Sequence, residues 1–359
     1  MKYVLSRGNL ALGEGDMQIG CHKKLLEYLG KKPQPRSPEE DSLLGWSATL
    51  QLFNRRRIIL VANDETRYNF IFYGIKKGDL KNFDDLLLGG IRSCFEQECI
   101  SPAIFDKYIA ETAGGAAIKF TKSPSPKITA RLRELLSSAT QFQSFFSLKT
   151  LLQFHITPSL NSNTFLPDEY CEPIRRTFVR ALKKRYGEDI FASRAVELEI
   201  TLGTSNVFRR RIVVPIQYNF RELHYIIATA FGWPNSGFLK HFLKYNYWLE
   251  KDSEGRPLSK LESEEPAPSD ISYESRLCYL VTLDEVFSKY SAITYNYRLE
   301  DGWAFAIKLV GFQDNHDKPY PVCVEGSVFT LPVSFSEDPP GSFDIDHVND
   351  QLEKMFYKG

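Results

Sequence analysis

The chain has 359 residues, of which 43% are hydrophobic and 13% aromatic, enough to form packed cores and to exclude an intrinsically disordered chain. Because single cores rarely grow beyond about 250–300 residues, two domains are expected. The 45 basic and 45 acidic side chains give a formal net charge of zero. A general attraction of the whole protein to nucleic acid or to an anionic membrane is therefore not expected.

No segment approaches the ~20 consecutive apolar residues of a membrane span, and the first residues lack the apolar run of a signal peptide. The six cysteines are scattered and include no C-x-x-C pair. In a chain of this size such cysteines are expected to be reduced and mostly buried. We therefore expect a cytoplasmic protein without a membrane partner.

The first part of the chain mixes strand and helix patterns. β-Branched and aromatic runs between turn residues predict strands at 2–5, 46–53, 57–62, 67–73 and 116–120. Apolar spacing and capping residues predict helices at 23–29, 82–99, 102–111, 127–138 and 173–186. The polar turn at 63–66 predicts a hairpin between the two strands that flank it.

The second part continues this mixture. Strands are predicted at 196–202, 211–215, 242–249, 294–299 and 303–310. Helices are predicted at 220–231, 283–290 and 344–357. Residues 250–272 are charged and contain prolines, which predicts a loop. The tight turn at 300–302 predicts a second hairpin.

Strands and helices follow one another without a regular βαβ rhythm. This predicts the α+β class, with largely antiparallel sheets and packed helices. We expect a small domain at residues 1–145, a connecting segment with a basic amphipathic helix at 146–194, and a second domain at 195–359.

An ordered set of short motifs runs through the second domain. It comprises Arg210-Arg211 before Val-Val-Pro, Leu223-His224, Phe231-Gly232-Trp233, Tyr295-x-Tyr297, Asp301-Gly302-Trp303 and Pro321-Val322-Cys323-x-x-Gly326. Together the motifs resemble the plasmid pRiA4b ORF-three-like family over about residues 195–355. The resemblance implies an α+β domain found on plasmids and beside transposases, similar to the TnpR-type passenger of an insertion element, and hence a bacterial protein. It implies no reaction.

The first domain carries a second set of motifs. These are Lys23-Lys24-Leu25-Leu26, Gly45-Trp46, Asn63-x-x-Thr66 and Gly74-Ile75-Lys76-Lys77-x-Asp79-Leu80-Lys81-Asn82. They are similar to domain-of-unknown-function family 6933 over about residues 1–145. This resemblance also implies no chemistry.

Candidate catalytic groups are few. The six histidines show no metal-ligand spacing and no glycine-rich phosphate loop is present, so we expect no metal and no cofactor. Cys323 follows His316 by seven residues and is the nucleophile to test in a hydrolase. The favoured interpretation is a half-buried, inert thiol. For His224, on an apolar helix face, the favoured role is that of a hydrogen-bonded structural histidine.

Three basic clusters are candidates for contact with phosphates. They are Arg55–Arg57, then the helix residues Arg175, Arg176, Arg180, Lys183, Lys184 and Arg185, and then Arg209, Arg210 and Arg211. On an amphipathic helix, such a run of charge is more often a solvated face.

Aromatic and polar side chains also crowd one part of the second domain. The candidates for a cleft there are His224, Trp233, His241, Tyr295, Tyr297, Asp301, Trp303 and Cys323. Such crowding usually marks a core, although Trp and Tyr are also favoured at recognition surfaces. The leading hypothesis is a non-enzymatic binding or interaction protein of plasmids or mobile elements, with a protein or nucleic acid as its partner. The alternatives are a nucleic-acid-associated accessory protein of mobile elements and an unrecognised hydrolase.

Overall fold

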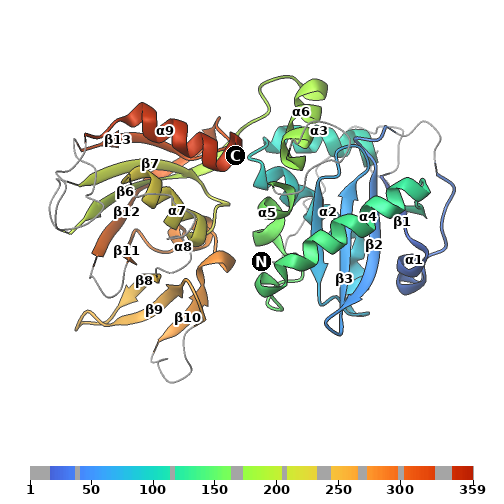
Figure 1. The fold of residues 1–359 in the computed structure, drawn as a ribbon, viewed down its shortest axis with the longest axis horizontal. Coiled ribbons are helices and arrows are strands. Elements are labelled where there is room, and N and C mark those ends of the chain that lie inside the picture. The colour runs from blue at the N-terminus through green and yellow to red at the C-terminus, as the bar shows by residue number, and fades with distance from the viewer. Residues whose placement is uncertain are drawn as a thin grey trace. The chain divides into compact units, whose positions relative to one another are not determined.

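The computed structural model describes residues 17–36, 41–113, 118–162, 173–203, 208–232, 244–265, 273–297, 303–327 and 342–358. The chain divides into two compact units, Met1–Ile190 and Phe191–Gly359. Each unit combines a sheet with helices (Figure 1), which confirms the predicted α+β class. Within the described residues, no helix has the length and apolarity needed to cross a bilayer.

The first unit is built on a mixed five-stranded sheet in the order β4-β3-β2-β1-β5. Its strands are β1 (Gln18–Cys21), β2 (Trp46–Phe53), β3 (Arg56–Asn63), β4 (Asn69–Tyr73) and β5 (Lys119–Lys122). The predicted β3–β4 hairpin is confirmed, and β2 and β3 form a second antiparallel hairpin. β1 runs parallel to both β2 and β5.

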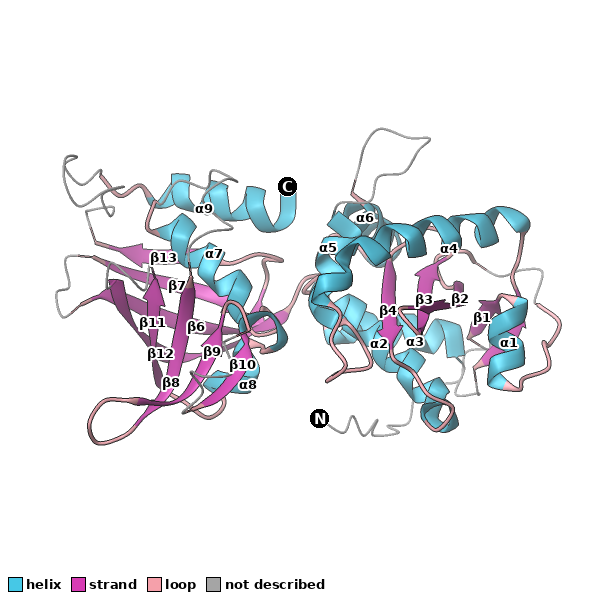
Figure 2. Cartoon of the chain, turned by 60° about the horizontal axis from the view of Figure 1, so that its bottom comes forward, coloured by secondary structure: helices cyan, strands magenta, loops and turns pink. Residues whose placement is uncertain are grey.

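Helices cover both faces of this sheet. They are α1 (Lys23–Leu29), α2 (Phe83–Gln97), α3 (Pro102–Ala113), α4 (Pro126–Ala139), α5 (Thr157–Ser162) and α6 (Ile174–Tyr186), with 3₁₀ turns η1 (Asp79–Asn82), η2 (Thr140–Phe145) and η3 (Phe154–Ile156). Figures 1 and 2 show α4 on one face and α2 and α3 on the other. On the α2 side, the Trp46 ring lies 5.9 Å from Phe70 and 6.5 Å from Phe178, which joins β2, β4 and α6 in one core.

The segment expected to be a connection differs in the structure, because its residues up to Ile190 belong to the first unit. Leu152 forms a bridge with Phe72 along the outer edge of β4. The side chain of Asn161, on α5, accepts from the backbone N–H of Asn69 at 2.9 Å and donates to its carbonyl at 2.8 Å. The physical reason is that the backbone groups on the outer edge of β4 need partners, and this segment supplies them.

The second unit has an eight-stranded sheet in the order β10-β9-β8-β11-β12-β6-β7-β13. Its strands are β6 (Ser193–Leu202), β7 (Arg209–Pro215), β8 (Tyr245–Lys251), β9 (Pro257–Glu262), β10 (Glu274–Leu277), β11 (Ala292–Tyr297), β12 (Trp303–His316) and β13 (Val322–Gly326). Neighbouring strands are antiparallel except β9 and β10. The predicted loop at 250–272 is therefore partly wrong, because β9 pairs with β8 and buries Leu261 completely.

The helices of this unit are α7 (Phe220–Ala230), α8 (Leu283–Phe287) and α9 (Ile345–Glu353), with η5 (Cys278–Leu280) and the π-helical turn η6 (Lys354–Lys358). A capping box between Asn219 and Glu222 starts α7, as local sequence favours. Leu223, Ile226 and Ile227 of α7 are fully buried, so this helix supplies much of the core. The predicted strand at 2–5 and the turn at 300–302 lie outside the described residues.

Candidate functional site

Four of the predicted cleft residues come together between helix α7 and the inner strands β11 and β12 of the second unit. Nδ1 of His224 lies 2.6 Å from the hydroxyl of Tyr295, and its ring stacks on Tyr245 with centroids 3.9 Å apart. Tyr297 lies 5.6 Å from the same imidazole. Trp303 pairs with Tyr297 across β11 and β12 and is 4% exposed. Because His224 and Tyr295 are also buried, these side chains form a polar aromatic core.

The remaining cleft candidates do not join this group. Trp233, His241 and Asp301 lie outside the described residues. Cys323 lies on β13, four places along the sheet from β11. Burial raises the pKa of the Cys323 thiol to about 11, which disfavours the nucleophilic thiolate. His316 lies with Nε2 3.0 Å from the carbonyl oxygen of Tyr320, and burial lowers the pKa of this imidazole.

Three of the six basic side chains of α6 pair with acidic neighbours. Arg175 binds the buried carboxylate of Glu98 through Nε at 3.1 Å and Nη2 at 3.0 Å, and the Tyr68 hydroxyl donates to the same carboxylate at 2.8 Å. Arg185 pairs with both Asp41 and Glu111. Lys183 pairs with Glu188 at 3.1 Å. Arg176, Arg180 and Lys184 complete the predicted helix cluster, and Arg180 and Lys184 are exposed.

The arginine triplet that starts β7 is also paired within the protein. Arg209 bridges Glu199 and Glu325, and Arg211 bridges Glu197 at 2.7 Å and Glu325 at 3.4 Å. Arg210 points to the opposite face and is completely buried.

The buried guanidinium of Arg210 is held by carbonyl oxygens and aromatic rings. It donates to the carbonyl of Ala230 at 2.9 Å and to that of Ser327 at 3.1 Å. Its carbon lies 3.9 Å from the Phe343 ring centroid. Burial lowers the pKa of Arg210 to about 10. A side chain packed in this way is placed to support the fold.

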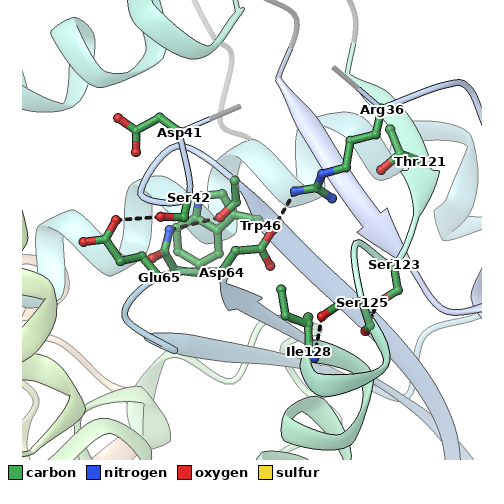
Figure 3. A network of polar contacts seen from close by, with 12 residues as sticks. Arg36, Asp41, Ser42, Trp46, Asp64, Glu65, Thr121, Ser123, Ser125 and Ile128 are labelled. Atoms are coloured by element: carbon green, nitrogen blue, oxygen red, sulfur yellow. Dashed lines mark hydrogen bonds and ion pairs between the residues drawn. The ribbon is translucent and has the colours of Figure 1, made fainter. Parts of the chain in front are cut away.

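A polar network at the α4 face of the first sheet was missed at the sequence level (Figure 3). Arg36 Nη2 donates to Asp64 Oδ2 at 2.9 Å, and the Asp64 side chain is 3% exposed. Burial raises the pKa of this carboxyl, and the nearby Ser47 hydroxyl and Arg36 partly offset the increase. Ser47, on β2, and Thr121, on β5, are completely buried.

Gly20 makes room for this network. A Cβ at Gly20 would lie 2.7 Å from Ser47 Oγ and 2.9 Å from Arg36 Nη1. The helix α4 begins beside these groups, and Ser125 caps it by accepting from Ile128 N at 3.2 Å. The close-packed pair of Arg36 and Asp64 is suited to joining residues 31–36 to the sheet. In the sequence, only the Asn63-x-x-Thr66 motif around Asp64 pointed to this network.

The structure also assembles a basic surface from three separate segments of the first unit. We call this surface the hairpin end, and it consists of Arg55, Arg56, Arg57, Lys76, Lys77, Lys81 and Lys149, all of them exposed. Within the described part of the chain, none of these seven side chains forms an ion pair with a carboxylate. This distinguishes them from Arg175, Arg185, Arg209 and Arg211.

Several contacts hold these segments together. Gly74 N–H donates to the Arg57 carbonyl at 2.9 Å, which ties the 74–77 loop to β3. The Arg57 guanidinium lies 4.5 Å from the ring centroid of Tyr28, on α1. The Phe146 ring lies 6.0 Å from Phe53 and 4.8 Å from Tyr73, so the segment before Lys149 packs beside the hairpin.

Comparison with known families gives two matches, one within each compact unit. Residues 18–176 match the family described as "Domain of unknown function (DUF6933)". Residues 194–333 match the family described as "Plasmid pRiA4b ORF-3-like protein". The chain carries these two domains in this order. The hairpin end therefore lies in the DUF6933 domain, and the His224–Tyr295 core lies in the plasmid pRiA4b ORF-3-like domain.

Comparisons with individual proteins add little. No curated protein matches the chain. One similar solved structure is the protein of unknown function MM3350 from Methanosarcina mazei Go1, with 20% identity and a TM-score of 0.31 over 46% of this chain and 82% of that one.

Proposed function

We propose that this protein is a non-enzymatic binding protein of plasmids or mobile elements, and that its DUF6933 domain holds a polyanionic partner. The observation that carries the proposal is a contrast between basic side chains. Arg175 and Arg185 of α6 and the three arginines of β7 are occupied by carboxylates or carbonyls, whereas the seven cations of the hairpin end form no ion pair within the described part of the chain.

The electrostatic argument follows from this contrast. Like charges on neighbouring loops repel one another and make the folded state less stable, so a compact cluster of cations is relieved by an external anion. Among the acidic residues nearby in sequence, the half-buried Asp79 uses its carboxylate to accept from the backbone N–H of Lys76 at 2.7 Å, and Asp84 and Asp85 lie in the first turn of α2. Residues 1–145 as a whole carry 21 basic and 16 acidic side chains.

The hydrolase alternative receives less support. A catalytic cysteine needs a depressed pKa and an adjacent base, whereas burial raises the pKa of Cys323 to about 11. His224 is stacked and hydrogen-bonded within a core. Cys323 and His224 can therefore both be explained as structural residues of the second unit.

Heparin, a polyanion without base edges or a bilayer, tests the proposal. The full chain should bind immobilised heparin and elute at a raised salt concentration. The variant Arg56→Gln/Lys77→Gln should elute at lower salt, because fewer counterions are released on binding. The control Arg176→Gln/Lys184→Gln removes the same charge from α6 and should elute like the parent. Failure of the parent to bind heparin, or equal losses in both variants, would contradict the proposal.

A further inference from the structure

The hairpin end has a specific shape in addition to its charge. The β2–β3 ladder runs from Trp46–Asn63 to Phe53–Arg56. β1 pairs with β2 only as far as Ala48, and the β4 ladder stops at Ile58. The last residues of β2 and the first residues of β3 therefore form a short two-stranded ribbon beyond the β1 and β4 ladders, at the lower end of this sheet in Figure 1. At its tip the Asn54 side chain donates to Gln143 Oε1 of η2 at 3.3 Å, so η2 lies beside the ribbon.

The tip of the ribbon is a tight turn. Asn54 and Arg55 have φ of 48° and 60°, as a two-residue type I′ turn requires. The turn presents three consecutive arginines, Arg55–Arg57, all exposed. On the strand before the turn, Gln51 is exposed and Leu52 is 66% exposed.

We propose that this ribbon enters the major groove of duplex DNA while the lysines of the hairpin end contact the flanking phosphates. This inference rests on the proposed function and names the polyanion. Paired strands lie about 4.8 Å apart, and the major groove of B-DNA is about 12 Å wide, so a two-stranded ribbon with its side chains fits. Arg binds guanine O6 and N7 in a bidentate manner, Gln binds adenine, and apolar groups contact the thymine methyl group.

The side chains at the tip distinguish DNA from other polyanions. An anionic bilayer presents no ordered base edges for Gln51 and for the planar guanidinium groups of Arg55 and Arg56. The major groove of duplex RNA is too deep and narrow for side chains to read. Single strands are usually held by aromatic stacking, whereas the exposed apolar residue on this ribbon is Leu52.

Fluorescence anisotropy with a labelled 20-base-pair DNA duplex tests the inference. The tip variant Arg55→Asn/Arg56→Gln keeps the turn, because Asn tolerates positive φ. It should bind about tenfold more weakly than the parent, because base contacts are lost, whereas Lys76→Gln/Lys77→Gln should reduce the salt slope by about 2 through lost phosphate contacts. The control Arg176→Gln/Lys184→Gln should match the parent, and all four proteins should show the same melting temperature.

Three further probes separate the explanations. A DNA duplex with glucosylated hydroxymethylcytosine, which fills the major groove, and a matched RNA duplex should both bind more weakly than plain DNA. Equal binding of all three duplexes would overturn insertion into the groove. Binding of heparin or phosphatidylserine vesicles without binding of DNA would overturn this inference while the polyanion proposal stands. Loss of heparin binding as well would remove both.

Discussion

The side-chain amide of Asn349 pairs with both backbone groups of Cys323. Its Oδ1 accepts from the Cys323 N–H at 2.8 Å, and its Nδ2 donates to the Cys323 carbonyl at 3.0 Å. Asn349 lies on α9, and Cys323 lies on β13, the last strand in the order of its sheet. The amide thus does what a neighbouring strand would do, and it occupies an edge that could otherwise pair with another chain.

Replacing this amide should destabilise the second unit and expose its edge. We expect Asn349→Ala to lower the free energy of unfolding by about 1–3 kcal/mol, because two partly buried backbone groups lose their partners. Light scattering should also show increased self-association. His347→Ala, at an exposed position on the same helix, is the control and should behave like the parent. An unchanged urea midpoint for Asn349→Ala would show that the pair contributes nothing.

The Arg175–Glu98 pair should be structural rather than part of a binding surface. The Glu98 side chain is 1% exposed, so Arg175→Gln leaves a buried charge without its main partner. We expect a loss of about 3–5 kcal/mol in the free energy of unfolding, measured by urea denaturation. The double variant Arg175→Gln/Glu98→Gln should lose less than the sum of the two single changes. Lys184→Gln on the same helix is the control and should unfold like the parent. If Arg175→Gln is as stable as the parent but binds heparin poorly, Arg175 belongs to a binding surface and the structural role is wrong.

Trp303 is expected to support the fold of the second unit. It is 4% exposed and stacks beside Phe305 with ring centroids 6.4 Å apart. Trp303→Ala should cost about 3–5 kcal/mol of stability and clearly lower the melting temperature. Phe312→Ala on the same strand should have a smaller effect, since Phe312 is 37% exposed. From the sequence we expect the same result for Trp233→Ala. If either tryptophan variant melts like the parent but no longer binds a partner, that tryptophan is a recognition residue.

His316 should make stability depend on pH in the mildly acidic range. Burial lowers the pKa of this imidazole below its usual 6.5, and the Tyr320 carbonyl and Asp317 partly oppose that change. The unfolded chain therefore binds more protons than the folded chain as pH falls below 6.5, so stability is lost on acidification and is fully present above this pH. His316→Gln should flatten the dependence of the melting temperature on pH below 6.5.

The two units should fold separately. Fragments 1–190 and 191–359 each keep a complete sheet with its own helices, so each should unfold cooperatively when expressed alone. Circular dichroism during urea denaturation measures this directly. If neither fragment shows a cooperative transition, the expected division into two domains fails.

The sequence by itself determined the local elements whose signals lie within a few residues. The helix at 23–29 and the strand at 46–53 have the predicted bounds, because apolar spacing and turn residues act locally. It also identified the two families from short ordered motifs. It missed β1, whose four residues are buried between two parallel strands and show no alternation.

Only the tertiary structure decided which charges are available to a partner. Arg175 and Arg56 look alike in the sequence, yet one binds a carboxylate 77 residues away and the other is exposed at the tip of a hairpin. The hairpin end gathers side chains from three segments, and Arg36 meets Asp64 across 28 residues. Such pairings depend on how strands cross and pack. Because a side chain's charge is neutralised by neighbours within a few ångströms rather than by neighbours in sequence, composition could not reveal them.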